Sequence, residues 1–311
     1  MIDIIFVNWN AGNLLKEAVS SIVQYHNNLV SKVVIVDNAS TDDSLARVEN
    51  LSDLPFDLEI IRNTVNNGFG AACNQGAEKC HAEFILLLNP DARLYEDSLP
   101  TAYRYLQEHP DVGVCSIQLV EEGNVIQRTC ARFPTPKMLL VHSTGLNRLP
   151  FIDAKSYHMH DWDHQDTREV DHVIGAFYLI RRSLFEQLQG FDEERFFVYL
   201  EDLDLSYRVK QAGYKIMYLT EAQAFHEGGG TSSQVKATRL FYSLRSRMIY
   251  AFKHFSKSAA WGVFLSTMFW EPVVRVIVAL LKGSTADAKN TVEGYKMLWS
   301  HSSDIIKGKG R

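Results

Sequence analysis

Three carboxylates stand close together in the stretch YLEDLDLSYR, which covers residues 199–208. Glu201, Asp202 and Asp204 lie among leucines and tyrosines there, although carboxylates resist burial and repel one another. A carboxylate beside apolar walls is a modestly stronger base, so this stretch could take a proton from a hydroxyl group. Adjacent residues of a helix point about 100° apart, so Glu201 and Asp202 cannot both face the same atom.

A structural explanation of these acids is also open. Acids favour the N-terminus of a helix, which would account for one or two of the three. Asp204 stands at i and Arg208 at i+4, a spacing that predicts a structural ion pair. The apolar lead-in FFVYL at 196–200 is not explained in this way, and it favours a catalytic role for Asp202.

A second carboxylate follows an apolar run. Asp91 comes directly after Pro90 and after the run EFILLLN at 83–89, and the proline stiffens the turn from which Asp91 projects. One carboxylate together with two phosphate oxygens is a typical way to hold Mg²⁺ or Mn²⁺. A helix cap is the structural alternative, but the helix expected to begin near Ser98 is too far along the chain.

Apolar runs alternate with helical patterns over the first ninety residues. Continuous Val, Ile, Leu and Phe runs are typical of parallel strands that are buried on both faces. The alternation predicts a doubly wound, mostly parallel sheet, in which ligands lie beyond the carboxyl ends of the strands. The expected strands are 3–9, 31–38, 58–64 and 83–89, and the expected helices are 13–26, 42–51 and 69–80.

Polar, turn-forming residues follow these predicted strands. They include Asn8, Asp37, the loop Asn66–Gly70 before the third helix, and Asn89. Each loop alone is ordinary turn chemistry, but four at one edge of a sheet predict a nucleotide-sized site. The chain has no G-x-G-x-x-G and no G-x-x-x-x-G-K-[ST], which argues against a dinucleotide enzyme and a P-loop NTPase. The glycines of the third-helix loop would let backbone N–H groups approach a phosphate.

Charge is distributed unevenly along the 311 residues. The net charge is −5, but the segment from Ser232 onward has 13 Lys and Arg against 4 Asp and Glu, which is +9 and leaves −14 elsewhere. A polyanionic surface is therefore an expected partner, with a merely solvated basic face as the alternative. The four cysteines form no C-x-x-C pair, which favours a reducing compartment, and no signal peptide is expected at the N-terminus.

Several of these stretches, in this order, resemble inverting glycosyltransferases of family 2, and most closely the rhamnosyltransferase-like members. The resemblance covers residues 2–230 and is specific as an ordered set. It implies the GT-A fold, an α/β Rossmann-like, mostly parallel sheet flanked by helices, here with a C-terminal helical extension. The matching stretches are VNWN, VIVDNASTDDS, NNGFGAACNQG, LLLNPDA and GAFYLIRRSLFEQLQGFDEERFFVYLEDLDLSYR.

The resemblance also implies catalytic and metal-binding roles. Asp202 would be the base that deprotonates the acceptor, and Glu201 would orient the acceptor. Asn89, Pro90 and Asp91 stand where the family has D-x-D, so Asp91 would bind the metal while an amide replaces the first acid. His226 stands where many relatives place a further metal or phosphate contact, and a structural histidine is the alternative.

The same resemblance implies positions around the two substrates. In the nucleotide site, Val7 and Asn8 would line the base pocket, Asp37 would hold base and ribose, and Asn67, Gly68, Asn74 and Asn89 would complete the site. Gly175 and Ala176 would form a wall near the donor sugar. The loop 158–164 does not have metal-ligand spacing and would lie on the acceptor side, where Trp162 would stack on a sugar.

The C-terminal part predicts helices at a membrane surface. Residues 236–256 form an amphipathic pattern, and residues 259–281 approach spanning length. Glu271, Pro272 and Arg275 would be costly in hydrocarbon, so we expect a helix, a proline-induced break and a second helix lying in the interface. An ordinary helical subdomain or an oligomer interface is the alternative. The aromatic side chains that suit the headgroup boundary are Trp261, Phe264, Phe269 and Trp270.

These expectations combine into one function. Residues 1–231 would be the catalytic domain, and residues 232–311 a basic helical region bound at an anionic membrane. The protein would transfer L-rhamnose from dTDP-rhamnose to a lipid-linked saccharide for surface polysaccharides, using Mg²⁺ or Mn²⁺. It would work peripherally on the cytoplasmic face of the plasma membrane, bind no nucleic acid, and could form a homo-oligomer. The alternatives are a UDP- or GDP-sugar donor, a nucleotidyltransferase, or a non-catalytic carbohydrate-binding relative.

Overall fold

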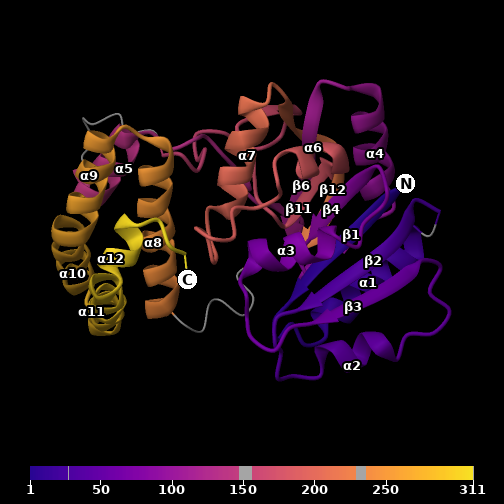
Figure 1. The fold of residues 1–311 in the computed structure, drawn as a ribbon, viewed down its shortest axis with the longest axis horizontal. Coiled ribbons are helices and arrows are strands. Elements are labelled where there is room, and N and C mark those ends of the chain that lie inside the picture. The colour runs from indigo at the N-terminus through magenta and orange to yellow at the C-terminus, as the bar shows by residue number, and fades with distance from the viewer. Residues whose placement is uncertain (27, 147–155, 229–235, 311) are drawn as a thin grey trace. The chain divides into compact units, whose positions relative to one another are not determined.

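The computed structural model describes residues 1–26, 28–146, 156–228 and 236–310 (Figure 1). The chain divides into two compact units. The boundary expected between 231 and 232 lies outside the described residues, and the structure groups 133–161 and 193–201 with the C-terminal helices. Unit 1 is Met1–Arg132, Trp162–Asp192 and Asp202–Thr231, and unit 2 is Phe133–Asp161, Glu193–Glu201 and Ser232–Arg311.

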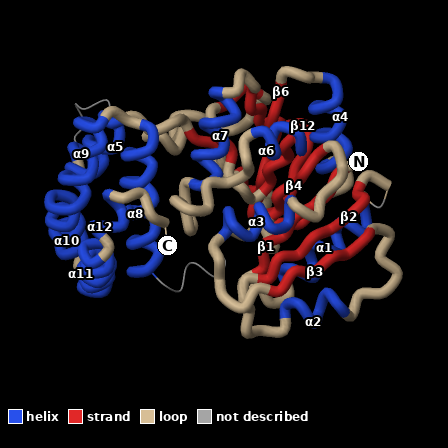
Figure 2. Tube along the Cα trace, in the orientation of Figure 1, coloured by secondary structure: helices blue, strands red, loops and turns tan. Residues whose placement is uncertain are grey.

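The first half of unit 1 has the predicted parallel strands, drawn in red in Figure 2. Their order in the sheet is β3-β2-β1-β4, and the neighbouring pairs are parallel. The expected strands and helices of this half are thus confirmed with small shifts at their ends. The elements are β1 (Ile2–Asn8), α1 (Leu14–Tyr25), β2 (Val30–Asp37), α2 (Ser44–Glu49), β3 (Asp57–Arg62), α3 (Phe69–Ala77) and β4 (Phe84–Leu88).

The second half of the sheet is mixed rather than parallel. Strand β11 (Phe177–Arg181) is antiparallel to both β4 and β6 (Val112–Glu121). Strand β12 (Lys215–His226) is parallel to β6 but antiparallel to β5 (Ala92–Leu94). The other elements of unit 1 are α4 (Ser98–Glu108), β7 (Val125–Ile126), β8 (Cys130–Ala131), β9 (Arg168–Val170), β10 (His172–Val173), α6 (Arg182–Gln187) and most of α7 (Glu201–Gln211).

Side chains of each central strand alternate between two helical layers. In β1, Ile4 and Phe6 belong to the buried cluster that also contains Leu15 of α1, Val48 of α2 and Leu99 of α4. The intervening Ile5 faces α3, whose Gly76 approaches it closely. This period of two explains why the strands read as continuous apolar runs, since both faces are covered.

Unit 2 is made of helices, and its long apolar segment is not broken as expected. Helix α9 (Lys257–Leu265) continues through the π-helical turn η3 (Ser266–Trp270) into α10 (Glu271–Leu281). Pro272 has no N–H for the carbonyl of Met268, and the indole Nε1 of Trp299 donates to that carbonyl instead at 3.0 Å. The other helices are α5 (Pro136–Thr144), α8 (Lys236–His254), α11 (Thr285–Ser300) and α12 (Ser302–Ile306).

The close approach of α3 to β1 yields a stability prediction. A Cβ added at Gly76 would lie 2.7 Å from Cγ2 of Ile5, which is closer than packed atoms allow. We expect Gly76→Ala to lower the free energy of unfolding by about 1–3 kcal/mol through overpacking. Gly262→Ala in α9 is the matched control, because nothing lies within 4 Å of its added Cβ. Calorimetric melting of both variants tests this, and an unchanged Gly76→Ala transition would contradict it.

Candidate active site

The carboxyl ends of β1 and β2 are joined by a buried amide. Asn8 and Asp37 lie opposite each other in the parallel register. Nδ2 of Asn8 donates to Oδ1 of Asp37 at 2.7 Å and to the hydroxyls of Ser40 and Ser44 at 3.1 and 2.8 Å. Asn8 is fully buried, and its hydrogen bond fixes the orientation of the Asp37 side chain. Val7, which precedes it, is half-buried.

Asn38 connects this strand end to the glycine loop before α3. Its Nδ2 donates to the carbonyl of Gly68 at 3.1 Å, and its Oδ1 accepts from Asn63 at 3.0 Å and from the N–H of Asn67 at 3.4 Å. Sequence reasoning considered Asn38 only as a helix cap and a turn residue, and it assigned no role to Asn63. The DNAS stretch was the signal that could have found Asn38, because a second amide beside Asp37 is available to fix a neighbouring loop.

Gly68 gives the loop a conformation that other residues rarely adopt. Its φ is 85° and its ψ is 169°, at the N-cap of α3, with no side-chain cap bond there. The backbone N–H groups of the first turn can therefore meet an anion.

Asn74 lies one turn further along α3 and is already engaged. Its Nδ2 donates to the carbonyl of Phe191 at 3.0 Å, and its Oδ1 accepts from the N–H of Phe191 at 2.8 Å. In this structure the amide therefore holds the 190–191 turn against α3. Its contact with a ribose or phosphate stays a prediction.

Asp91 and His226 lie close together although they are far apart in the sequence. Strand β5 pairs with the end of β12, with Ala92 opposite His226, and Oδ1 of Asp91 lies 3.4 Å from Nε2 of His226. Nδ2 of Asn89 lies 3.5 Å from the same nitrogen. The pairing of β5 with β12 thus brings three predicted residues into one cluster.

Gln127 sets the orientation of the His226 ring. Its Nε2 donates to the carbonyl of His226 at 2.9 Å, so its Oε1 faces the ring and accepts from Nδ1 at 2.7 Å. The other ring nitrogen, Nε2, then points toward Asp91 and Asn89. No pattern in the sequence pointed to Gln127, because only the tertiary pairing of β6 and β12 brings it near.

Asp202 is held at the start of α7 by backbone N–H groups. Its Oδ1 accepts from the N–H of Leu203 at 2.8 Å, and its Oδ2 accepts from the N–H of Gly175 at 3.1 Å. Its side chain keeps 20% of its surface exposed, so a substrate can reach it. Nε2 of the buried His172 lies 3.8 Å from Oδ2, a neighbour that sequence reasoning missed.

The residues around Asp202 on α7 have separate functions. Arg208 donates to Asp204 at 2.9 Å and also to the carbonyls of Leu188 and Gly190, which confirms the predicted ion pair. Glu201 is buried at the first position of α7. Tyr199 and Leu200 just before it have φ of 67° and 63°. Such left-handed backbone costs about 1–2 kcal/mol per residue and is common beside active sites.

Gly175 and Ala176 connect Asp202 to the Asn89 loop. The N–H of Gly175 donates to Asp202, and the carbonyl of Ala176 accepts from the N–H of Asn89 at 3.1 Å. A Cβ at Gly175 would lie 3.2 Å from the ring of Phe69, so a glycine allows this close approach. Two adjacent residues therefore hold the candidate base and the candidate metal loop in one neighbourhood.

Trp162 has a different environment from the expected one. It is 7% exposed, its Nε1 donates to Asp166 at 2.8 Å, and His164 stacks on it with centroids 4.0 Å apart. The guanidinium of Arg168 lies 4.2 Å from the ring centroid. The predicted stacking on an acceptor sugar thus lacks the exposed ring surface that it needs.

Comparisons with known proteins find a matching family model and several similar proteins. A family model described as "Glycosyl transferase family 2" matches residues 3–189. The low-salt glycan biosynthesis hexosyltransferase Agl10 of Haloferax volcanii is 25% identical over 83% of this chain and 77% of its own length. The N-acetylglucosaminyl-diphospho-decaprenol L-rhamnosyltransferase of Mycobacterium tuberculosis is 23% identical over 80% of this chain and 83% of its own.

A solved structure shares the fold. The mannosyltransferase PcManGT from Pyrobaculum calidifontis, in complex with GDP-Man and Mn²⁺, superposes with a TM-score of 0.56 and 18% identity. The match covers 99% of this chain and 85% of that protein. The predicted GT-A architecture of an α/β sheet flanked by helices is confirmed by this likeness and by the strand order.

Buried histidines give unit 1 a pH-dependent stability. Burial lowers the pKa of His26, His164 and His172 below the ordinary 6.5. Between that value and the lowered folded values, the unfolded chain binds more protons than the folded one, so stability falls as the pH drops below about 6.5. Above that pH the contribution of these residues is complete.

We therefore expect the melting temperature to decrease as the pH is lowered from 7.5 to 5.5. The decrease should be smaller in the His172→Gln variant than in the parent chain. The difference between the two chains isolates one histidine from the acids that also titrate. Calorimetry across this range measures it. Identical slopes for the two chains would contradict the burial effect.

Proposed function

This chain belongs to glycosyl transferase family 2, and from that premise we propose that it transfers L-rhamnose from dTDP-rhamnose to a lipid-linked saccharide. Its enzymatic class is that of a glycosyltransferase. The observation that carries the proposal is the backbone link through Gly175 and Ala176, which connects Asp202 to the Asn89–Asp91 loop. In an in-line transfer the base and the diphosphate site lie on opposite sides of one anomeric carbon, so they must be held at a fixed separation.

In the proposed reaction Asp202 acts as the general base. The acceptor oxygen attacks the anomeric carbon, the bond from that carbon to the phosphate oxygen breaks, and dTDP leaves. The hydroxyl proton passes to a carboxyl oxygen of Asp202, while the N–H groups of Gly175 and Leu203 fix its direction. Attack opposite the leaving group inverts the anomeric configuration, and a transition state with oxocarbenium character is expected.

The cluster of Asp91 and His226 fits a divalent metal ion. In the neutral tautomer that carries its proton on Nδ1, His226 presents the lone pair of Nε2 to the Asp91 carboxylate at 3.4 Å. These two atoms could then bind one divalent cation between them. No group of three His, Cys, Asp or Glu side chains with metal-binding geometry occurs among the described residues. This pair would therefore leave the remaining ligand positions to phosphate oxygens and water, as Mg²⁺ and Mn²⁺ accept.

A bound metal ion would supply charge for the departing diphosphate. On the protein side, the N–H groups of the first turn of α3, which follows Gly68, would contact phosphate oxygens. The N–H of Gly68 itself donates to Oδ1 of Asn66 at 2.9 Å. Asp37, oriented by Asn8, would accept hydrogen bonds from the base or ribose, with Val7 and Asn67 beside them. This assignment uses the carboxyl ends of β1 and β2 and the loop before α3.

The identities of the donor sugar and of its nucleotide are the most specific part of the proposal. The relative from M. tuberculosis, named for rhamnosyl transfer to a decaprenol-linked sugar, supports rhamnose and a lipid-linked acceptor. The hexosyltransferase of H. volcanii supports the broader alternative of another donor. A thermal-shift comparison of dTDP, UDP and GDP, each with and without Mn²⁺, distinguishes a dTDP-sugar donor from a UDP- or GDP-sugar donor. A lipid-linked acceptor would place the enzyme peripherally at the cytoplasmic face of a membrane.

Replacement of Asp202 by Asn should remove the base and keep the shape. We expect kcat for transfer to fall by about 10²–10⁴-fold, with the affinity for dTDP changed less than about twofold, because the base acts in the transition state. Release of dTDP from the donor and calorimetric binding of dTDP measure the two effects. A variant that keeps more than a few per cent of the rate would show that Asp202 is not the base.

Replacement of Asp91 by Asn should act on metal-dependent binding. We expect the affinity for dTDP in Mn²⁺ to weaken by about tenfold or more, and the metal-free affinity to stay unchanged, since one anionic ligand is lost. Asp97→Asn is the matched control, because Asp97 is exposed and makes no side-chain cap bond to α4. Equal titrations for the Asp91 variant and this control would remove Asp91 from the metal site.

A further inference from the structure

One side of the helical segment 257–281 in unit 2 is apolar and exposed. Its large side chains follow one another at spacings of three or four residues, with one adjacent pair in the π-helical turn and another at the C-terminal end, which is the pattern of a single helix face. We call them the apolar face. Its members, each at least 41% exposed, are Trp261, Leu265, Phe269, Trp270, Val273, Ile277, Leu280 and Leu281.

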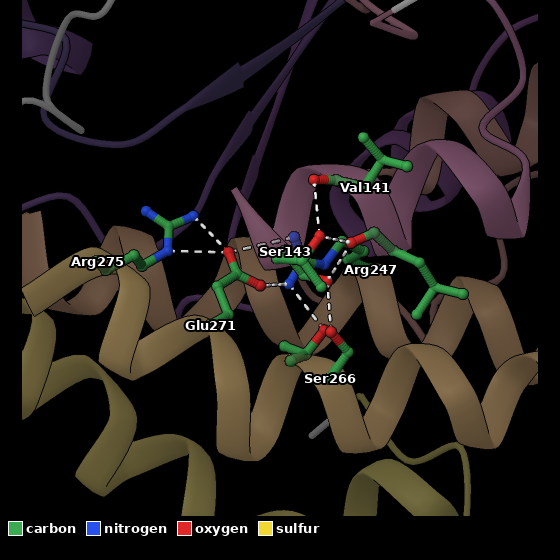
Figure 3. A network of polar contacts seen from close by, with 9 residues as sticks. Val141, Ser143, Arg247, Ser266, Glu271 and Arg275 are labelled. Atoms are coloured by element: carbon green, nitrogen blue, oxygen red, sulfur yellow. Dashed lines mark hydrogen bonds and ion pairs between the residues drawn. The ribbon is translucent and has the colours of Figure 1, made fainter. Parts of the chain in front are cut away.

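The acid inside this segment is turned toward the interior of unit 2. Glu271 is 1% exposed and forms ion pairs with the buried Arg247 and, at 2.7 Å, with Arg275 (Figure 3). Arg247 also donates to Thr267 at 2.8 Å. The acid that seemed too costly for an apolar surface is therefore buried and neutralised, and it pairs with Arg275, whose side chain is 34% exposed.

The π-helical turn fixes which side is exposed. The N–H of Glu271 bonds to the carbonyl of Ser266, so the turn holds one residue more than an α-helical turn. Ser266 is also held by a 2.6 Å hydrogen bond to Ser143 of α5 (Figure 3). The extra residue lets Phe269 and Trp270 both reach the surface, at 65% and 58% exposure. The two adjacent aromatic side chains of the apolar face therefore lie in the π-helical turn that the bond to Ser143 holds in place.

The segment is long and apolar enough to span a membrane, but its other side is occupied. It has 25 residues, a mean hydropathy of 1.7 in its most apolar window, and one third of that window buried. Ala260, Val263, Met268 and Ala279 are buried on that side. Helices α8 and α11, which pack in the same unit, contain exposed lysines that lipid tails would not surround. A helix with one apolar and one protein-covered side lies flat at an interface.

Basic residues flank the apolar face at both ends. Lys257 begins α9 and Lys282 follows α10, and both are exposed. The segment from Ser232 onward has 13 basic and 4 acidic residues. Tryptophans and lysines at the edge of an apolar surface match the headgroup layer, where rings and ammonium groups find polar partners.

We propose that the apolar face docks unit 2 onto a bilayer containing anionic lipids, with the segment 257–281 parallel to the membrane plane. Phe269, Trp270 and their neighbours insert among the lipid chains, and Lys257 and Lys282 contact headgroup phosphates. Docking would bring the enzyme to the surface that carries a lipid-linked acceptor, a consequence that rests on the proposed function.

The test is flotation of the full-length chain with vesicles of phosphatidylcholine alone or with an equal part of phosphatidylglycerol. We expect binding to the mixed vesicles, a loss of at least tenfold in partitioning for the double variant Phe269→Asp with Ile277→Asp, and no loss for Val125→Asp. Val125 is 55% exposed and lies in unit 1, so it controls for an added charge at an exposed apolar site. Lys257→Gln with Lys282→Gln should weaken binding to the mixed vesicles only.

Three further measurements keep the outcomes distinct. Melting of the double variant shows whether unit 2 still folds. Fluorescence of the intact chain should shift to shorter wavelength on vesicles as Trp261 and Trp270 leave water. Asp202→Asn should bind vesicles as the parent does, so a failed transferase assignment leaves this result untouched. Absence of flotation by the parent chain, or a dimer in sedimentation that the double variant splits, would overturn the proposal.

Discussion

Two backbone hydrogen bonds made by adjacent residues hold the chemistry of unit 1 together. The N–H of Gly175 orients Asp202, and the carbonyl of Ala176 fixes the Asn89 loop. Backbone groups just before a central strand move little, because β11 is bonded to strands on both sides. The candidate base and the metal loop therefore keep one separation, which side chains on flexible loops could not maintain.

The carboxyl ends of β1 and β2 are held by amides rather than by charges. Asn8 and Asn38 are both buried, and each satisfies several partners from adjacent loops. Buried amides of this kind rigidify a site at a smaller desolvation cost than ions. Asp37 can thus point outward from a scaffold that holds it, and α3 can keep its N–H groups free of a side-chain cap.

Unit 2 differs from unit 1 because it leaves an apolar surface exposed. The ion pair of Glu271 with Arg247 is buried, while Arg275, the second partner of Glu271, is about one third exposed. A buried pair adds little net stability because both partners lose water. Its effect is on orientation, because a charge drawn into the interior turns the opposite side of the helix outward. The proline that suggested a break is absorbed by the π-helical turn and by Trp299.

The sequence by itself determined the family through the resemblance of an ordered set of motifs. It also determined the parallel half of the sheet and the ion pair of Asp204 with Arg208, because these follow from local periodicity and short spacings. Tertiary structure alone decided what depends on distant residues. It placed β11 antiparallel in the sheet, gave His226 its partner Gln127 and buried Trp162. Hydrogen bonds between residues a hundred positions apart leave no trace in local pattern, so no spacing rule predicts them.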